Sequence, residues 1–149
     1  MNGEIKFRVW SKSFKQWMNH CAVIDCSGNI GSHFVEVKEN KEFLEHFAPL
    51  PKEDCIVQQF TGLLDKNGKE IYEGDILKIA AHANSPEFGK NGKVYWNNSH
   101  GAYWISFNDG TSAIPQLNTS TNGIMDEKSR DEIIGNIFEN PELVAKASN

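Results

Sequence analysis

Glycine-containing turns recur so closely in the second half of the chain that no long helix fits between them. Such turns are predicted at residues 65–68, 73–74, 91–92 and 108–110, each ending in glycine. Glycine readily adopts the positive φ that tight turns require. Short apolar segments joined by tight turns are typical of antiparallel β structure. The sequence therefore predicts a mainly β fold with minor α structure.

Alternating apolar residues place the predicted strands between the turns. In residues 4–10, Ile5, Phe7 and Val9 share one face, which we expect to be buried, and residues 16–18 return as the partner strand. A second hairpin is predicted around residues 27–29. Further strands are predicted at residues 56–63, 69–72, 75–80, 93–96, 102–107, 111–114 and 132–138. The last five are sufficient for a small SH3-like β-barrel.

One helix is predicted in the first half of the chain, at residues 41–47. Asn40 can cap its first turn, and Phe43, Leu44 and Phe47 fall on one face. The proline at position 49 ends this helix, because proline disfavours helix in the residue before it.

Proline and polar residues mark the connections between the predicted elements. The Pro-Leu-Pro sequence at 49–51 marks a predicted boundary between an N-terminal hairpin and short-helix region (residues 1–50) and a C-terminal barrel-like domain (residues 51–149). A polar loop is predicted at residues 118–123. The Asn-Pro pair at 140–141 predicts a short terminal helix, with asparagine as the cap.

Composition restricts the class of protein. Hydrophobic residues make up 39% of the 149 residues and aromatic residues 11%, which is enough for a packed core. We expect a cytoplasmic protein without a membrane role, because no apolar run approaches the roughly 18 residues of a membrane span and the start lacks the apolar region of a signal peptide. The net charge of −5 argues against a protein whose main work is coating nucleic acid.

Three segments carry a family resemblance: residues 60–76 read FTGLLDKNGKEIYEGDI, residues 5–10 read IKFRVW and residues 134–143 read IGNIFENPEL. They resemble, in that order, the signature, the N-terminal strand and the ending of the YopX family, small proteins encoded mainly by bacteriophages and prophages. The family usually has Ala and Asp where this chain has Val9 and Ser11. The signature residues are Gly62, Asp65, Gly68, Tyr72, Gly74, Asp75, Gly135, Asn136, Asn140 and Pro141.

The resemblance implies a mainly β fold and a phage or prophage origin, and it transfers no catalytic, cofactor-binding or metal-binding residue. We therefore expect a non-catalytic binding or accessory protein without a cofactor, acting in the bacterial host cytoplasm on an unknown protein or nucleic-acid partner. The alternative is a nucleic-acid-associated module, and an enzyme of unknown chemistry is third. A homo-oligomer is compatible with the sequence.

Carboxylates gather in the signature at Asp65, Glu70, Glu73 and Asp75. Several oxygen ligands on one loop could hold a divalent cation, but the spacing does not match an EF-hand loop. Turn formation explains the same residues. We therefore expect Asp65→Asn to change stability little, and valine at Gly68 or Gly74 to destabilise the protein.

The cysteines and histidines do not form a motif. His20, Cys21, Cys26 and His33 lack zinc-site spacing, so no zinc is expected. Together with Cys55 these cysteines are expected to be reduced thiols.

Aromatic residues crowd two neighbouring strands of the predicted barrel: Tyr95, Trp96, Tyr103 and Trp104. If side chains alternate along each strand, one aromatic of each pair faces outward, where it could hold a peptide or stack on bases. Cross-strand pairing that stabilises the sheet is the structural alternative. A basic strip at Lys6, Arg8, Lys12 and Lys15 is interpreted as a solvated strand face.

Overall fold

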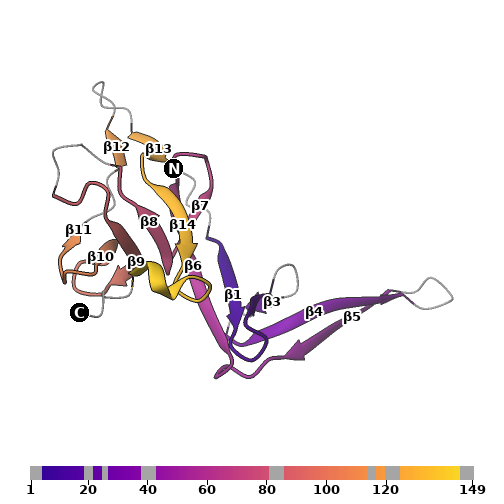
Figure 1. Cartoon of the computed structure of the whole chain (residues 1–149). Coiled ribbons are helices and arrows are strands. Elements are labelled where there is room, and N and C mark those ends of the chain that lie inside the picture. The colour runs from indigo at the N-terminus through magenta and orange to yellow at the C-terminus, as the bar shows by residue number, and fades with distance from the viewer. Residues whose placement is uncertain are drawn as a thin grey trace. The chain divides into compact units, whose positions relative to one another are not determined.

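The computed structural model describes residues 5–18, 22–24, 27–37, 43–80, 86–113, 117–119 and 125–144. Its described part is mainly antiparallel β, as predicted (Figure 1). The elements are β1 (Phe7–Ser11), β2 (Gln16–Trp17), β3 (Ala22–Ile24), β4 (Ile30–Val37), β5 (Phe43–Pro49), β6 (Cys55–Leu64), β7 (Glu70–Tyr72), β8 (Asp75–Lys78), β9 (Asn91–Asn97), β10 (Ala102–Phe107), β11 (Ser112–Ala113), β12 (Leu117–Thr119), β13 (Met125–Ser129), β14 (Glu132–Asn136) and the 3-10 helix η1 (Pro141–Val144).

The chain divides into two compact units. The N-terminal unit is Lys6–Gln58, and the C-terminal unit is Gln59–Asn149 together with Met1–Ile5. The division between the units therefore falls within β6, whereas the boundary predicted from the two prolines lies before this strand. The predicted division at residue 50 stays a prediction.

In the N-terminal unit, β3, β4 and β5 form an antiparallel sheet. The predicted second hairpin is confirmed, since Ala22 pairs with Ser32 across the turn. β4 and β5 run side by side as a long ribbon, from Gly31 opposite Pro49 to Val37 opposite Phe43 (Figure 1).

The helix predicted at residues 41–47 is wrong where the structure describes it, because Phe43–Pro49 is strand β5. Asn40, the expected cap, lies outside the described residues. An isolated helix of two turns is marginal in water. The eight-residue strand β4 instead gives this segment a partner for its backbone hydrogen bonds.

The hairpin of β1 and β2 pairs Trp10 with Trp17, and β1 also lies beside β6. The predicted buried face of β1 is only partly correct. Val9 is buried, but Ile5 is 72% and Phe7 47% exposed.

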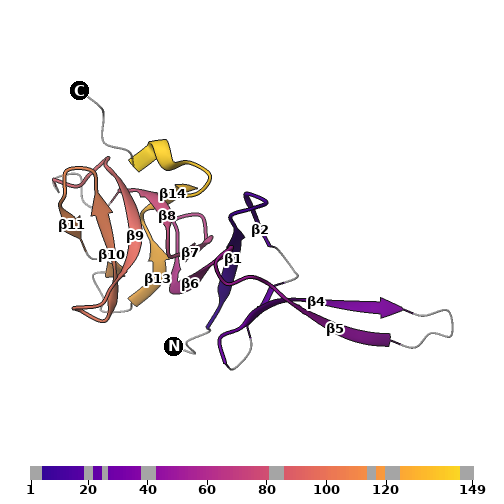
Figure 2. The ribbon, with the colours of Figure 1, turned by 90° about the horizontal axis from the view of Figure 1, so that it is seen from below.

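In the C-terminal unit, five strands form one sheet in the order β11-β10-β9-β8-β14 (Figure 2). These are the five strands predicted for the barrel, and SH3-like closure stays a prediction. The core of this unit contains Ile71, Leu77, Ile79, Val94, Ile105 and Phe107. Gly92 packs directly against this core. A Cβ at this position would lie 2.2 Å from Ile105 Cγ2 and 2.8 Å from Phe107 Cε1, so a larger side chain does not fit.

Two other predictions in this unit change. The loop predicted at residues 118–123 is partly strand, because β12 includes Thr119, which pairs with Met125 of β13; residues 120–124 lie outside the described part. Threonine favours strands when a partner is present. The terminal helix is the single 3-10 turn η1, in which the Leu143 N–H donates to the Asn140 carbonyl. Among the described residues, no helix is long and apolar enough to cross a membrane.

Candidate functional site

Strands β9 and β10 bring the four predicted aromatic residues together in two cross-strand pairs. Trp96 lies opposite Tyr103, and Tyr95 lies opposite Trp104. Because side chains alternate along a strand, the first pair shares the face of the buried Val94 and the second pair the other face.

Trp96 is the exposed member of the group. It lies near the end of β9, beyond the core, and is 42% exposed although it shares the core-side face. The Trp96 and Tyr103 rings meet edge to face, with centroids 5.0 Å apart and an interplanar angle of 72°. Such contacts stabilise a pair by about 0.5–1.5 kcal/mol beyond burial, so Tyr103 limits the orientations of Trp96.

Tyr103 connects this pair to the core and to a carboxylate. Its side chain packs against the core residues. Burial raises the pKa of the Tyr103 hydroxyl, and the negative charge of Glu73 raises it further. The Tyr103 hydroxyl therefore lies within the electrostatic influence of a carboxylate.

On the other face, Trp104 is partly buried. The His100 ring lies 4.6 Å from it, centroid to centroid. Trp104 Nε1 is buried without a hydrogen-bond partner, and in the described part of the chain Asn91 Oδ1 is the other such side-chain atom.

Asp65 organises the signature turn. Its carboxylate accepts backbone N–H groups of Asn67 and Lys69, at 2.8 Å each, and of Ile133, at 3.3 Å. Burial alone would raise the pKa of Asp65, but these donors outweigh it and hold the pKa below its ordinary value. An asparagine would keep only one of the two acceptor oxygens, so the expectation that Asp65→Asn changes little no longer follows.

The second signature carboxylate joins the middle of the chain to its ending. Asp75 accepts the Tyr72 N–H at 2.8 Å and the Asn136 side-chain amide at 3.1 Å, and both Asp75 and Asn136 are buried. Gly135 leaves room for Asn140, whose Oδ1 would lie 2.5 Å from a Cβ at position 135. Pro141 follows as the first residue of η1.

The other two acidic residues and the signature glycines also have local roles. Glu70 accepts a hydrogen bond from the Tyr72 hydroxyl at 2.8 Å. Gly62, Gly68 and Gly74 all adopt positive φ, of 85°, 82° and 79°. Among the described residues, no set of three carboxylate, imidazole or thiol groups could hold a metal ion.

Cys55 is partly buried, with a free thiol. Burial raises the pKa of this thiol, and the charge of Asp54 adds to the effect. Nucleophilic cysteines are activated by a lowered pKa, so the raised pKa of Cys55 does not favour such a role. His20, Cys21 and Cys26 lie outside the described residues, and the side chain of His33 is not described either.

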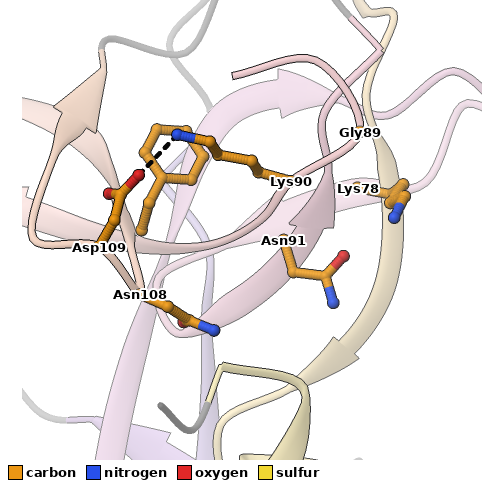
Figure 3. Close-up of a pocket in the computed structure, with 7 residues that line it drawn as sticks. Lys78, Gly89, Lys90, Asn91, Asn108 and Asp109 are labelled. Carbon is orange, nitrogen blue, oxygen red and sulfur yellow. Dashed lines mark hydrogen bonds and ion pairs between the residues drawn. The ribbon is translucent and has the colours of Figure 1, made fainter. Parts of the chain in front are cut away.

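A hollow of about 360 Å³ lies between β8, β9 and the turn after β10. The labelled Lys90 and Asp109 point toward one another (Figure 3), with Nζ and Oδ2 2.6 Å apart. Lys90 also lies 5.5 Å from the centre of the Phe107 ring. The hydrogen bond from Lys90 lowers the pKa of Asp109, followed in effect by that from Thr111. This ion pair satisfies both charges within the hollow.

The sequence alone does not reveal this hollow. Its residues come from segments around positions 78, 89–91 and 107–109. The predicted Asn-Asp-Gly turn locates Asp109, but no spacing rule links it to Lys90.

The match to a family model decides what kind of protein this is. The YopX protein family matches residues 6–145. The chain belongs to the YopX family. A crystal structure of protein EF1440 from Enterococcus faecalis is similar, with a TM-score of 0.56 and 23% identity over 95% of this chain and 98% of that one. At this identity the likeness supports the fold alone. No curated protein matches the chain.

In this YopX-family chain, two of the three segments that carried the resemblance meet in one place. The Asp65 carboxylate accepts the Ile133 N–H beside the ending, and Asp75 contacts Asn136 within it. These signature residues hold the C-terminal unit together.

Proposed function

We propose that this YopX-family protein is a non-catalytic binding protein encoded by a phage or prophage and acting in the cytoplasm of the bacterial host. The observation that carries the proposal is the exposed Trp96, held edge to face by Tyr103 at the end of β9 and β10. Tryptophan and tyrosine dominate the affinity of many protein interfaces. A tryptophan whose orientation is already limited loses little freedom on binding.

The charge around this pair favours a protein partner that presents a lysine or arginine. Glu73 places a negative charge beside Tyr103, and the indole face of Trp96 attracts cations. The same carboxylate would repel phosphate groups, so nucleic-acid binding through these four aromatics has less support. An enzyme remains the third alternative.

The test begins with retention of host proteins on the purified full-length protein, followed by titration of the identified partner. We expect Trp96→Ala to weaken binding by at least about 10-fold, in line with the loss of an interface hot spot. Glu73→Gln should weaken it less and reduce its salt dependence.

The matched control is Phe88→Ala, because Phe88 is 50% exposed in the same unit and lies in the segment before β9, outside the pair formed by Trp96 and Tyr103. This variant should bind as the unsubstituted protein does. A partner that binds the Trp96→Ala variant with unchanged affinity would show that the proposed surface is wrong.

A further inference from the structure

The first hairpin has a charge opposite to that of the chain as a whole. Residues 5–18 contain four basic residues, Lys6, Arg8, Lys12 and Lys15, and no acidic residue, although the net charge of the chain is −5. Four aromatic residues, Phe7, Trp10, Phe14 and Trp17, are interleaved with them. Interleaved cations and aromatics are the pattern of surfaces that follow a single nucleic-acid strand. On this hairpin the exposed rings are Phe7 and Phe14, because Trp10 is buried and packs against Trp17.

The turn between β1 and β2 is held in one shape by Asp54. Oδ1 accepts the Ser13 N–H at 2.7 Å and the Ser13 hydroxyl at 2.6 Å, and Oδ2 accepts the Ser11 hydroxyl at 2.8 Å. These bonds, that from the Ser13 hydroxyl first, lower the pKa of Asp54. The Ser11 hydroxyl oxygen in turn accepts the Phe14 N–H at 3.2 Å.

This ordered turn displays an aromatic ring to solvent. Phe14 is 74% exposed, and Phe7 on the same hairpin is 47% exposed. Lys15 beside it adopts φ +50°, a conformation unusual for a lysine. Single exposed apolar side chains are common on protein surfaces. Phe14 and Phe7 are distinguished by lying on one hairpin with four basic residues and no acidic residue.

A second loop of the same unit lies against the hairpin and carries one lysine, Lys52, beside the acidic residues Glu53 and Asp54. The Lys12 N–H donates to the Asp54 carbonyl at 2.9 Å, and Lys12 Nζ donates to the Glu53 carbonyl at 2.5 Å. These bonds hold the exposed turn that contains Lys52 against the hairpin. The carboxylate of Asp54, which lies between the two loops, is already occupied by serine donors.

We propose that the β1–β2 hairpin and the Lys52 turn bind single-stranded nucleic acid, with Phe14 and Phe7 stacking on bases and Lys12, Lys15 and Lys52 facing phosphates. Stacking on exposed rings requires unpaired bases and tolerates any sequence. This inference does not rest on the proposed function, because its residues belong to the N-terminal unit and Trp96 belongs to the other.

The test is fluorescence anisotropy of the full-length protein with a labelled oligothymidine of about 20 nucleotides, a length that exceeds the site of one small binding surface. With about three phosphates contacted, log K should fall against log salt with a slope of about −2. We expect Phe14→Ala to weaken binding about 10-fold, the size of effect expected for one lost stacking contact. A duplex of the same length should bind more weakly than the single strand.

Two variants separate stacking from charge. Lys15→Asn removes a charge but keeps a residue that tolerates positive φ, and it should reduce the magnitude of the salt slope by about 0.7. Phe88→Ala, an exposed phenylalanine of the other unit, should leave the affinity unchanged, as should Trp96→Ala.

Three results would each overturn the inference. One is the absence of oligonucleotide binding at about 50 mM salt, where phosphate contacts are strong. Another is binding that Phe14→Ala does not weaken, which would indicate general charge attraction. The third is a host protein, in place of nucleic acid, that is retained by the unsubstituted chain and lost with Phe14→Ala.

Discussion

The two units of this chain differ in how they are held together and in their charge. The C-terminal unit contains thirteen acidic and eight basic residues, whereas the N-terminal unit contains seven of each. Among the residues whose burial the structure describes, most of the buried hydrophobic ones belong to the C-terminal unit, and those of the N-terminal unit are Val9, Trp10 and Ile30.

The first hairpin of the N-terminal unit is held by polar and aromatic contacts among the described residues. The Arg8 guanidinium lies 4.2 Å from the centre of the Trp17 ring, and its Nε and Nη2 both donate to Gln58 Oε1. Polar contacts contribute less per residue than apolar burial, and salt or charge substitution perturbs them more readily. Substitutions in the two units should therefore differ in size.

The largest loss is expected in the C-terminal core. Gly92→Val would force a side chain into Ile105 and Phe107 and should lower the free energy of unfolding by about 3 kcal/mol or more. Urea denaturation measures it. The control is Gly110→Asn, because Gly110, unlike Gly92, has positive φ and has open space around it. This substitution should lower the free energy of unfolding by less than about 1 kcal/mol. Equal losses for the two variants would mean that the contacts with Ile105 and Phe107 do not set the size of the effect at Gly92.

The next largest effect concerns Asp65. Asp65→Asn should lower the free energy of unfolding by about 2 kcal/mol at neutral pH. The reason is that some of the N–H groups that donate to the Asp65 carboxylate lose their acceptor. The control is Lys66→Gln, because Lys66 is the next residue in the chain and its side chain is half exposed. This substitution leaves no buried N–H group without an acceptor. A loss at Asp65 no larger than that at Lys66 would contradict the role of the buried carboxylate.

The same carboxylate predicts a pH dependence. Because the folded-state pKa of Asp65 is lowered, its contribution is complete above the ordinary aspartate pKa of about 3.9 and is lost as pH falls through the folded-state value. The stability difference between the unsubstituted protein and Asp65→Asn should therefore narrow below about pH 4. Urea midpoints measured across this range test it, and a constant difference would contradict it.

A somewhat smaller loss is expected at the signature glycines. Gly68→Val and Gly74→Val should each cost at least about 1–2 kcal/mol, because both positions have positive φ. Thermal melts with and without excess calcium or magnesium also test the metal alternative. If divalent cations raise the midpoint of the unsubstituted protein and Glu73→Gln abolishes that rise, the acidic residues form a metal site.

In the N-terminal unit, Arg8→Met should cost about 1 kcal/mol, through loss of the contact with Trp17 and of the hydrogen bonds to Gln58. Lys15→Gln in the same hairpin is the control and should change stability little. Tryptophan fluorescence during urea unfolding gives the measurement. If Arg8→Met lowered the free energy of unfolding as much as Gly92→Val, the expected difference in sensitivity between the two units would be wrong.

The smallest effect is expected at an exposed ion pair. Lys66 and Glu132 lie 2.6 Å apart, but their side chains are 46% and 40% exposed. Lys66→Gln should change the free energy of unfolding by no more than about 0.5 kcal/mol, and added salt should remove the difference. A larger change in urea denaturation would mean that surface charge contributes more than the comparison allows.

The sequence predicted most strands of the C-terminal unit because their ends are encoded locally. Gly68, Gly74 and Gly110 occupy positive-φ turns, and a glycine in an Asn-Gly or Asp-Gly turn can be recognised without knowing the fold. β5 could not be predicted in this way. The spacing of Phe43 and Phe47 fits one face of a helix as well as one face of a strand, and pairing with β4 decides between them.

The candidate sites were only partly predictable. Alternation predicted that Tyr95 and Trp96 lie on opposite faces, but the pairing of Trp96 with Tyr103 depends on the register of β9 and β10. The exposure of Trp96 depends on where the core ends along β9. The hairpin was predicted, but the exposure of Phe7 was not, because alternation does not say which residues of a face the rest of the fold covers.

The contact between Asp75 and Asn136 has a consequence for synthesis on the ribosome. These residues are 61 positions apart, and β14 completes one edge of β8. At about 5–20 residues per second, roughly 3–12 s pass between the emergence of β8 and that of its partner. During this interval the edge of β8 is open to pairing with another nascent chain. The last strand to be made thus also ends the period in which the protein is most prone to aggregate.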